Sequence, residues 1–507
     1  MSQLTNPEAA ESTGPQAGRR EWIALAVLML PLLLVSMDVS VLYFAVPFIA
    51  QDLEPTATQQ LWIFDVYGFV LAGLLLTMGA VGDRIGRRRL LLIGAAGFGL
   101  ASCAAAYAST PEMLIAARAV LGIAGATLMP STLALLRNLF LDEKQRATAI
   151  GIWTAVMSGG VAVGPVLSGV LLEHFWWGSV FLVNLPAMVL LLVLVPFLVP
   201  EFAVDKTRRF DLPGAVLSLL AVLPVVYGVK QVAAQDATAL DVAAIAFGLA
   251  AGAAFVVRLR TARHPMLDTR LFVDRGFRSA LLCTVVAMFA LIGNAVFTTQ
   301  YLQSVLGMSP LVAALWSLAP TVVVGAAAPT SVSVAQKVGS AAVEGVGFLL
   351  AALGFLMLTL AETDGLVAVL IGATVLAAGL VSVLSVAGET AMRTISPERA
   401  GSASALMETA SELGGALGMA LLGSVGAWAY RSGLDLPAGV PGPAADAAHE
   451  TLGGALAVAR SLPDSLAGSV VDAARLAFVD ALHAEVMVGA ALMLIAAAVT
   501  LAGARRS

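Results

Sequence analysis

The chain has 507 residues, of which 59% are hydrophobic and only 12% are charged. Apolar runs of roughly 18 residues or more recur along its length, which excludes an ordinary soluble domain and indicates a protein that crosses a membrane many times. The net charge is −5, and the two cysteines and four histidines lack the spacing of a metal site or a disulfide framework. We therefore expect no metal and no cofactor. An enzyme is the least supported class, because no nucleophile–base pair is recognisable.

The first 20 residues are polar and are predicted to be disordered. Arg19 and Arg20 precede the first apolar run, but no small-residue cleavage site closes that run, so we expect an uncleaved first span rather than a signal peptide. Fourteen membrane-spanning helices are predicted along the chain. They lie at 22–48, 58–81, 89–108, 112–136, 146–171, 179–199, 211–232, 240–259, 278–305, 309–333, 340–361, 365–391, 400–429 and 478–503.

The positions of the basic residues predict the orientation of these spans. An even number of spans places both termini on one side, and most of the 28 Lys and Arg residues fall in the loops on that side. Because cytoplasmic loops carry an excess of Lys and Arg, both termini are predicted to be cytoplasmic.

The chain is predicted to divide into two six-helix bundles with two extra helices between them. The predicted parts are a disordered terminus at 1–20, a bundle at 21–200, two extra helices at 201–260, a basic linker at 261–277 and a second bundle at 278–507. The second bundle includes an external segment, 430–477, whose pattern predicts a hairpin of two short amphipathic helices. We hypothesise that this hairpin gates an outer vestibule. Similar loops follow the second and tenth spans, at 83–86 and 336–339, which fits a duplicated transporter.

Four carboxylates lie inside predicted spans: Asp38, Asp65, Glu408 and Glu412. A charge at the centre of a bilayer helix costs roughly 2.5–3.5 kcal/mol on insertion scales, so such residues are usually functional. Membrane acids of this kind carry protons, ions or cationic substrates. Glu344 is also acidic, but it lies nearer a cytoplasmic end and is interpreted as interfacial or structural.

Asp65 lies near two aromatic residues, Trp62 and Tyr67. A carboxylate beside aromatic faces suits a lipophilic cation, because cation–π attraction of about 0.5–2 kcal/mol adds to charge pairing. The alternative is a structural ion pair with Arg118, which lies inside the fourth span and needs an internal partner. Asp38 falls at a similar depth and could be that partner instead.

Glu408 and Glu412 are four residues apart and therefore share one helix face. Two like charges so close in a medium of low dielectric disfavour the doubly ionised state, which suits a proton carrier. A further set of large or polar residues could line an adaptable pocket, although apolar residues of membrane helices more often face lipid or neighbouring helices. The candidates are Met129, Trp153, Met157, Asn294, Trp316 and Met407.

Two glycine-rich motifs stand out. The segment 79–89 reads GAVGDRIGRRR, in which glycines permit a tight turn and clustered arginines favour the anionic cytoplasmic face; the alternative is a loop that only sets topology. The segment 160–169 reads GVAVGPVLSG, in which small residues four apart allow close helix approach and Pro165 allows bending; the alternative is ordinary close packing.

These motifs resemble those of the major facilitator superfamily. The segment 79–89 is similar to its signature loop, and the resemblance implies a conformational latch formed by Gly79, Asp83, Arg84, Gly86 and Arg87. Arg118 with Gly122 resembles the span-four signature that is linked there to proton coupling. The antiporter signature of the drug-efflux families is matched by Gly160, Gly164, Pro165 and Gly169, with Ser168 where a glycine is usual.

Further matches narrow the resemblance to the fourteen-helix drug/proton antiporters, and among them to the quaternary-ammonium and cationic-dye efflux pumps. They include Asp38 with Pro47, the segment 60–67, Met129 with Pro130, and the segment 408–414. The resemblance implies an all-α membrane protein of the major facilitator fold, with helices arranged as 6+2+6. The acid that some relatives carry in the tenth span has no counterpart near Gly325.

We therefore expect a monomeric, proton-coupled multidrug efflux antiporter of the bacterial cytoplasmic membrane. Its expected partners are lipophilic cations such as quaternary ammonium compounds, dyes and biocides, together with protons and the lipid bilayer, and no nucleic acid. Two other functions remain open: a proton-coupled transporter of one specific metabolite, and a non-transporting membrane receptor or scaffold in which the acids are structural.

Overall fold

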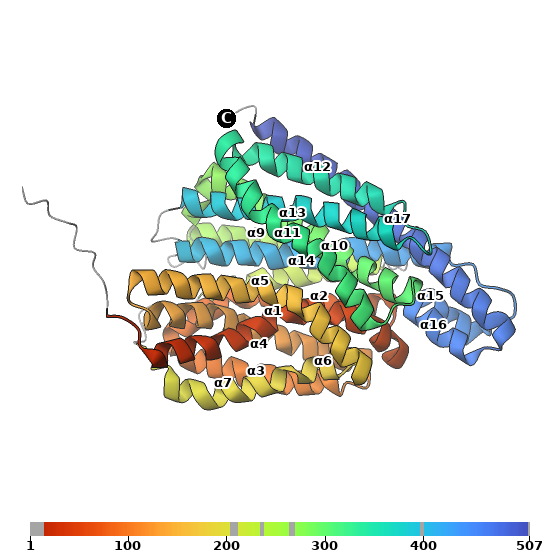
Figure 1. The fold of residues 1–507 in the computed structure, drawn as a ribbon, viewed down its shortest axis with the longest axis horizontal. Coiled ribbons are helices and arrows are strands. Elements are labelled where there is room, and N and C mark those ends of the chain that lie inside the picture. Colours follow the sequence, from red (N-terminus) through yellow and green to blue (C-terminus); the bar gives the residue numbers. More distant parts are fainter. Residues whose placement is uncertain (1–14, 203–210, 234–237, 263–268, 396–399, 505–507) are drawn as a thin grey trace, which may run out of the picture.

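The computed structural model describes residues 15–202, 211–233, 238–262, 269–395 and 400–504, and every regular element in these ranges is a helix. Within the helices some side chains are also outside the described set, those of Asp65 and Asp83 among them. The predicted disordered terminus and most of the predicted basic linker lie outside the described residues. Figure 1 shows the helices running roughly alongside one another in two groups.

The first group contains α1 to α7, which pack mainly against one another. Their bounds are α1 Arg19–Leu53, α2 Ala57–Ile85, α3 Arg87–Ala106, α4 Pro111–Leu139, α5 Glu143–His174, α6 Ser179–Leu182 and α7 Asn184–Leu198. We call α1–α7 the N-terminal half. Two further helices, α8 Leu212–Ala233 and α9 Ala239–Thr261, pair with each other, and α8 also touches α2 and α14.

The second group begins with a short 3-10 helix and ends with the longest helix of the chain. The elements are η1 Thr269–Val273, α10 Arg275–Gln300, the π-helix η2 Tyr301–Val305, α11 Pro310–Val338, α12 Ser340–Leu358, α13 Leu366–Thr394, α14 Ala400–Gly433, α15 Gly442–Glu450, α16 Leu452–Ser461 and α17 Asp464–Ala504. We call α10–α14 with α17 the C-terminal half. The short helices α15 and α16 form a hairpin that projects beyond one end of the bundle (Figure 1).

Side chains at the helix starts explain several boundaries. The Thr56 hydroxyl accepts the amide of Gln59 and begins α2, and Asp142 and Asp274 accept amides three residues on to begin α5 and α10. Such caps satisfy amides that have no partner within the helix.

Two glycines end helices at matching places in the two halves. Gly86 follows α2 with φ +105° and Gly339 follows α11 with φ +94°. This backbone region favours glycine, because it has no Cβ to clash. The two turns therefore share a backbone conformation, which agrees with the weak repetition of the two loops in the sequence.

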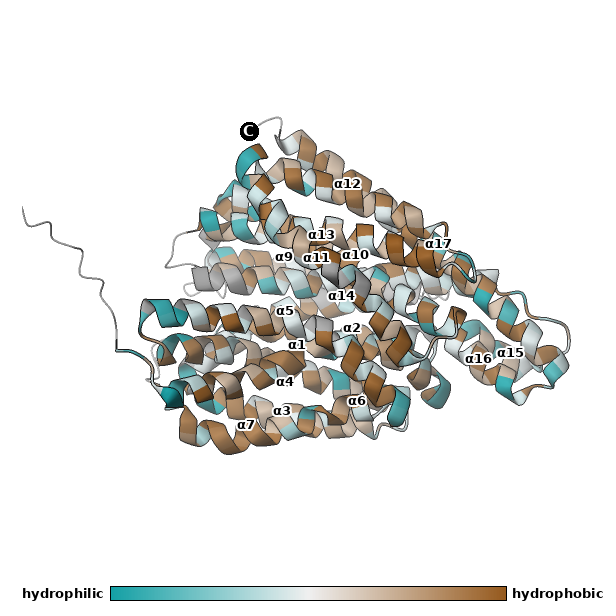
Figure 2. Cartoon of the chain, in the orientation of Figure 1, coloured by the Kyte–Doolittle hydropathy of each residue, from teal (hydrophilic) through white to brown (hydrophobic). Residues whose placement is uncertain are grey.

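Each predicted span falls on helical residues of the structure. Over the described residues, eleven helices are long and apolar enough to cross a membrane. The other three predicted spans fall on α2, α5 and α8, so the count of fourteen and the cytoplasmic position of the termini stay predictions. Figure 2 shows hydrophobic residues along the bundle and hydrophilic ones concentrated toward the helix ends. Apolar side chains also cover the outside, as Leu100 and Phe197 do at 73% and 72% exposure, which is the pattern of a lipid-facing surface.

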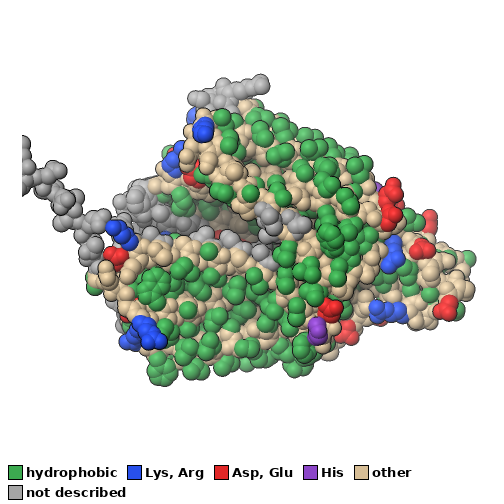
Figure 3. Space-filling view, in the orientation of Figure 1, with side chains coloured by type: hydrophobic (Ala, Val, Ile, Leu, Met, Phe, Trp, Pro, Cys, Tyr) green, Lys and Arg blue, Asp and Glu red, His purple; other side chains and the backbone are tan. Residues whose placement is uncertain are grey.

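At the end that carries the hairpin, the two halves meet closely and the hairpin packs against the N-terminal half. A Cβ added to Gly169 of α5 would lie 2.7 Å from the Cα of Leu311 in α11, and one added to Gly453 of α16 would lie 2.5 Å from the Cβ of Ala50 in α1. At the other end Figure 3 shows the surface hollowed between the halves. The closed contact at the hairpin end is called the outer seam below.

Candidate functional site

A cavity of about 230 Å³ lies between the two halves. Its walls come from α1, α2, α4 and α5 on one side and from α10 and α14 on the other. Most of the lining is apolar, with methionines prominent. The lining residues are Val35, Ser36, Ser40, Tyr43, Phe64, Tyr67, Gly68, Met129, Met157, Met288, Ile292, Glu408, Ser411, Glu412, Gly415, Ala416 and Met419. Unbranched thioether side chains adapt to ligands of different shape.

Glu408 and Glu412 supply the acidic groups of the described cavity lining. Both are partly buried on one face of α14, as their four-residue spacing predicts. Among the described residues, neither carboxylate has a hydrogen-bond or ion-pair partner. The Oε2 of Glu412 lies 3.7 Å from the position that a Cβ on Gly68 of α2 would occupy. This carboxylate of the C-terminal half therefore faces the N-terminal half directly.

Glycines of α14 hold this helix close to α10. A Cβ on Gly414 would lie 2.4 Å from the carbonyl oxygen of Val285, and one on Gly418 would lie 1.9 Å from that of Phe289. Only glycine permits backbones to approach so closely, as in small-residue packing motifs of membrane helices. This contact turns the neighbouring face, with both glutamates, toward the cavity.

A second polar cluster lies beside the cavity in the N-terminal half. The Arg118 guanidinium is completely buried and forms an ion pair with Asp38 of α1. Its Nε also donates to the Ile63 carbonyl at 3.0 Å, and its Nη2 to the Phe64 carbonyl at 3.4 Å. Arg118 thus joins α1, α2 and α4, and Asp38 is the internal partner that its place in the membrane requires.

Tyr67 separates this cluster from the cavity. The centre of its ring lies 4.7 Å from the Arg118 guanidinium carbon, which is a cation–π distance, and the same residue lines the cavity. Its hydroxyl is buried without a hydrogen-bond partner in the described part of the chain. The phenol is therefore a polar group in the cavity wall that is available to a ligand.

The structure brings some of the predicted acids together and separates others. Glu408 and Glu412 line the cavity, whereas Asp38 lies behind Tyr67 in the ion pair with Arg118. The helix position of Asp65 is in α2, but its side chain lies outside the described residues.

Three of the predicted pocket residues, Tyr67, Met129 and Met157, line the cavity, and five do not belong to its described lining. Two of these five make side-chain hydrogen bonds: the Trp153 indole donates to the Thr132 hydroxyl at 3.4 Å, and the Asn294 amide donates to the Thr298 hydroxyl at 3.1 Å. The Trp62 ring lies 6.4 Å from the Tyr227 ring, between centroids. Trp316 is 44% exposed, and Met407 packs against the hydrophobic core.

The glycines of the 160–169 segment make two different contacts. Cβ atoms on Gly160 and Gly164 would lie 1.9 Å and 2.1 Å from the hydroxyls of Ser36 and Ser40 in α1. The Ser168 hydroxyl donates to the Val41 carbonyl at 2.9 Å, so serine joins the same helix pair where related motifs have glycine. Gly169, by contrast, contacts α11 across the outer seam. Pro165 lies partly buried within α5 between these contacts.

The loop at 79–89 packs within its own half at the end opposite the hairpin. The Arg88 and Arg89 guanidinium groups lie 3.6 Å and 3.9 Å from the carboxylate of Glu201, which follows α7. A Cβ on Gly86 would lie 2.6 Å from the same carboxylate, and one on Gly82 would lie 2.8 Å from Arg87. A Cβ added to Gly79 would meet no described atom within 4 Å. Arg84 is exposed, and the side chain of Asp83 lies outside the described set. A latch role for these residues stays a prediction.

Four cavity-lining residues and one buried acid are not marked by the motifs of the sequence. Tyr43, Phe64, Met288 and Met419 line the cavity, and nothing in an apolar run marks which of its residues face inward. Glu485 had a visible signal, because it is an acid within the last predicted span. It is completely buried, and neither of its carboxylate oxygens has a hydrogen-bond partner within the described ranges.

Taken together, two helical halves around a central cavity define a membrane transporter of the major facilitator fold. The sequence profile of the Major Facilitator Superfamily matches residues 28–257. The chain is 45% identical to the multidrug efflux pump LfrA of Mycolicibacterium smegmatis, over 96% of this chain and 97% of that protein. It is 36% identical to the methyl viologen resistance protein SmvA of Salmonella typhimurium, over 95% and 97% of the two chains. The chain belongs to the major facilitator superfamily, within its drug/proton antiporter family.

Solved structures agree on the fold. A bacterial homologue of the human lysosomal transporter Spinster, in an inward-facing and occupied conformation, superposes with a TM-score of 0.65 at 17% identity, over 96% of this chain and 98% of the other. The nucleoside transporter NupG superposes with a TM-score of 0.59 at 11% identity, over 96% and 99%. The relatives therefore support drug efflux as the general function, while these solved structures support only the architecture.

Proposed function

We propose that this protein exports lipophilic cations from the cell in exchange for protons, and that both ligands compete for the carboxylates of Glu408 and Glu412. The observation that carries the proposal is a pair of carboxylates, without a hydrogen-bond or ion-pair partner among the described residues, in a largely apolar, methionine-rich cavity between the halves. An apolar wall favours a lipophilic body, and a carboxylate beside aromatic rings favours a positive charge. A proton that neutralises the carboxylate removes the attraction and releases the cation.

The electrical work limits the coupling. Moving one positive charge outward against an inside-negative potential costs about 2.3 kcal/mol per 100 mV, and each entering proton offsets about the same amount. A monovalent cation exchanged for one proton is therefore driven by the pH gradient alone, and a dication needs at least two protons to be neutral. Two glutamates in one cavity suit the second case. The Salmonella relative is named for resistance to methyl viologen, whose molecule carries two quaternary nitrogens.

Transport then requires the halves at 21–200 and 278–507 to rock about the cavity in the bacterial inner membrane, as a monomer with both termini cytoplasmic. In that orientation the closed outer seam and the hollow at the opposite end correspond to an inward-facing state. Arg118 with Asp38 and the cavity-lining Tyr67 would transmit a change in cavity charge to α1, α2 and α4, and Asp65 would add a further acid to the coupling. The 79–89 loop would latch the halves at the cytoplasmic end in the opposite, outward-facing state.

The test is ethidium transport by the purified protein in liposomes, with an imposed pH gradient and with that gradient collapsed. We expect transport only with the gradient in the native protein, and its loss in the Glu408→Gln/Glu412→Gln double variant. The matched control is Glu344→Gln, because Glu344 is a buried acid of α12 beside Cys283, outside the cavity. Gradient-driven transport that survives in the double variant would refute the proposed coupling.

A further inference from the structure

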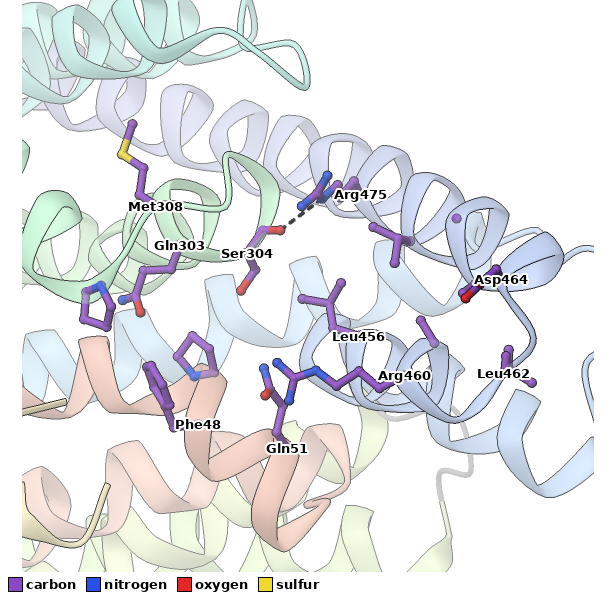
Figure 4. A pocket seen from close by; sticks show the side chains of 16 residues that line it. Phe48, Gln51, Gln303, Ser304, Met308, Leu456, Arg460, Leu462, Asp464 and Arg475 are labelled. Carbon is purple, nitrogen blue, oxygen red and sulfur yellow. Dashed lines mark hydrogen bonds between the residues drawn. The ribbon is translucent and has the colours of Figure 1, made fainter. Parts of the chain in front are cut away.

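A second and larger cavity, of about 590 Å³, lies at the hairpin end of the molecule. Its walls come from α1 of the N-terminal half, from η2 and α17 of the C-terminal half, and from α16 of the hairpin. Figure 4 shows that side chains from all of these elements converge on one space. The cavity shares no described lining residue with the central one, so it is a separate site that spans the outer seam.

Hydrogen-bond donors predominate among the polar groups of this outer cavity. Arg460 extends from α16 toward Gln51 of α1, and Arg475 extends from α17 toward Ser304 (Figure 4). The Arg475 Nε donates to the Ser304 carbonyl at 3.2 Å, and its Nη2 lies 3.7 Å from the position that a Cβ on Gly307 would occupy. The Arg460 guanidinium makes no hydrogen bond or ion pair with any described residue. The described lining holds two guanidinium groups and one carboxylate, that of the exposed Asp464, so its charged side chains give a positive balance.

The side-chain amide of a buried glutamine is a further hydrogen-bond donor in this cavity. Gln303 of η2 is only 9% exposed and lines the same cavity, and its Nε2 has no hydrogen-bond partner in the described part of the chain. Buried donors are nearly always satisfied by protein, water or ligand, so this donor indicates a missing acceptor. The rest of the lining is largely apolar, with Phe48, Met308 and Leu456 among its members.

We propose that the outer cavity is a binding site for an anionic amphiphile, in which a phosphate or carboxylate group pairs with Arg460, Arg475 adds positive charge to the wall, and an apolar portion lies against Phe48 and Leu456. Guanidinium groups bind such oxyanions with charge-assisted hydrogen bonds. Because the walls belong to both halves, a bound anion joins the halves and stabilises the closed outer seam. The site would thus regulate transport from outside the central cavity, and its ligand differs in charge from the exported cation.

Binding is tested with the purified full-length protein by calorimetry, using inorganic phosphate, short-chain phosphatidylglycerol and short-chain phosphatidylcholine as probes. We expect phosphatidylglycerol to bind and phosphatidylcholine, whose headgroup is neutral overall, to bind at least tenfold more weakly. Phosphate binding in addition would identify a free anion as sufficient, and its absence would identify the lipid headgroup with its tail. Equal binding of the two lipids, or binding of no probe, would overturn the proposal.

Two substitutions in the cavity wall test whether the anion binds in this cavity. Arg460→Gln should raise the Kd of phosphatidylglycerol about tenfold, which corresponds to about 1.4 kcal/mol. This substitution is suitable because Arg460 is exposed and its guanidinium makes no hydrogen bond or ion pair with a described residue, so folding should be unaffected. Arg475→Gln is the second variant. The control is Arg393→Gln, an exposed arginine of the last turn of α13, away from the cavity lining. An unchanged Kd in both cavity variants would place the anion elsewhere and overturn the proposal.

Discussion

At the scale of single residues, the proposed competition between a cation and a proton depends on the charge of Glu412. Its carboxylate lies in the cavity opposite Gly68, without a described partner. Protonation removes the negative charge, so the affinity for a cation should fall as the pH falls. We predict that Glu412→Gln weakens ethidium binding roughly tenfold at mildly alkaline pH, equivalent to about 1.4 kcal/mol, and flattens its pH dependence. Equilibrium binding across a pH series measures both effects.

The control for this prediction is again Glu344→Gln, which should keep the pH dependence of the native protein. A Glu412→Gln protein whose affinity still fell steeply on acidification would show that another group carries the competing proton. Glu408 would be the first such group to examine, because it shares the cavity and the helix face.

Asp38 differs from Glu412, because it already forms an ion pair with Arg118. Arg118 is completely buried, and removal of one member of a buried ion pair leaves an uncompensated charge, at a cost of about 3–5 kcal/mol. We predict that Asp38→Asn markedly lowers the Tm of the purified protein, and that the double variant Asp38→Asn/Arg118→Gln recovers part of the loss. Thermal unfolding in detergent measures both variants. If the double variant were no more stable than the single one, the cost would not come from the unpaired charge.

At the scale of helices, the packing of α14 on α10 depends on glycine. A Cβ on Gly418 would overlap the Phe289 carbonyl oxygen, so α14 must move away to accept it. We predict that Gly418→Ala costs about 1–3 kcal/mol of stability, as overpacking usually does, and also lowers cation affinity, because the glutamates move with the helix. Gly325→Ala in α11 is the control, since its added methyl group meets no described atom within 4 Å. Equal effects of the two variants on Tm would contradict this account.

The existence of the helices was predictable, while their facing directions were not. Long apolar runs place the helices, and the structure shows that residues such as Thr56 and Asp142 cap the starts of two of them. In a bilayer, however, lipid and protein interior are both apolar, so a spanning helix has little contrast between its faces. Trp316, a predicted pocket residue, is instead 44% exposed and outside the described lining of the cavity, and Met288 lines the cavity without any sequence signal.

Polar residues are the exception, because the membrane makes them costly wherever they lie. For this reason Glu408, Glu412 and the need of Arg118 for a partner could be recognised from the sequence, and the structure places the first two in the cavity. The identity of that partner as Asp38 could not, since Asp65 lies at a similar depth in the next helix. Glu485 fits the same rule but was not among the predicted site residues. That it is buried without a hydrogen-bond partner in the described ranges is visible only in the structure.

At the scale of the whole molecule, the contacts of the N-terminal half with the C-terminal half and with the hairpin join residues that are far apart in the chain. Gly169 meets Leu311, and Gly453 meets Ala50. No local pattern predicts such pairs, because close packing at a seam requires only a small residue on one side and leaves the other side unspecified. We expect these contacts to hold this end of the transporter closed, so that a single added side chain changes the balance.

Gly169→Val should open the outer seam. Its Cβ would lie 2.7 Å from the Leu311 Cα, which is backbone and cannot rotate away, so the halves must separate at the hairpin end. A clash that costs the closed form about 1.4 kcal/mol multiplies the open population tenfold relative to the closed one. We predict that an impermeant thiol reagent modifies Ser304→Cys, a buried lining residue of the outer cavity, several-fold faster in the Gly169→Val background.

The background also requires Cys103→Ser and Cys283→Ser, because both native cysteines are free. Gly159→Val is the matched control on the same helix, since an added Cβ there meets no described atom within 4 Å. Equal labelling in the two backgrounds would mean that the Gly169 contact does not keep the seam closed. Faster labelling only in Gly169→Val would identify one glycine as a determinant of which side of the membrane the central cavity faces.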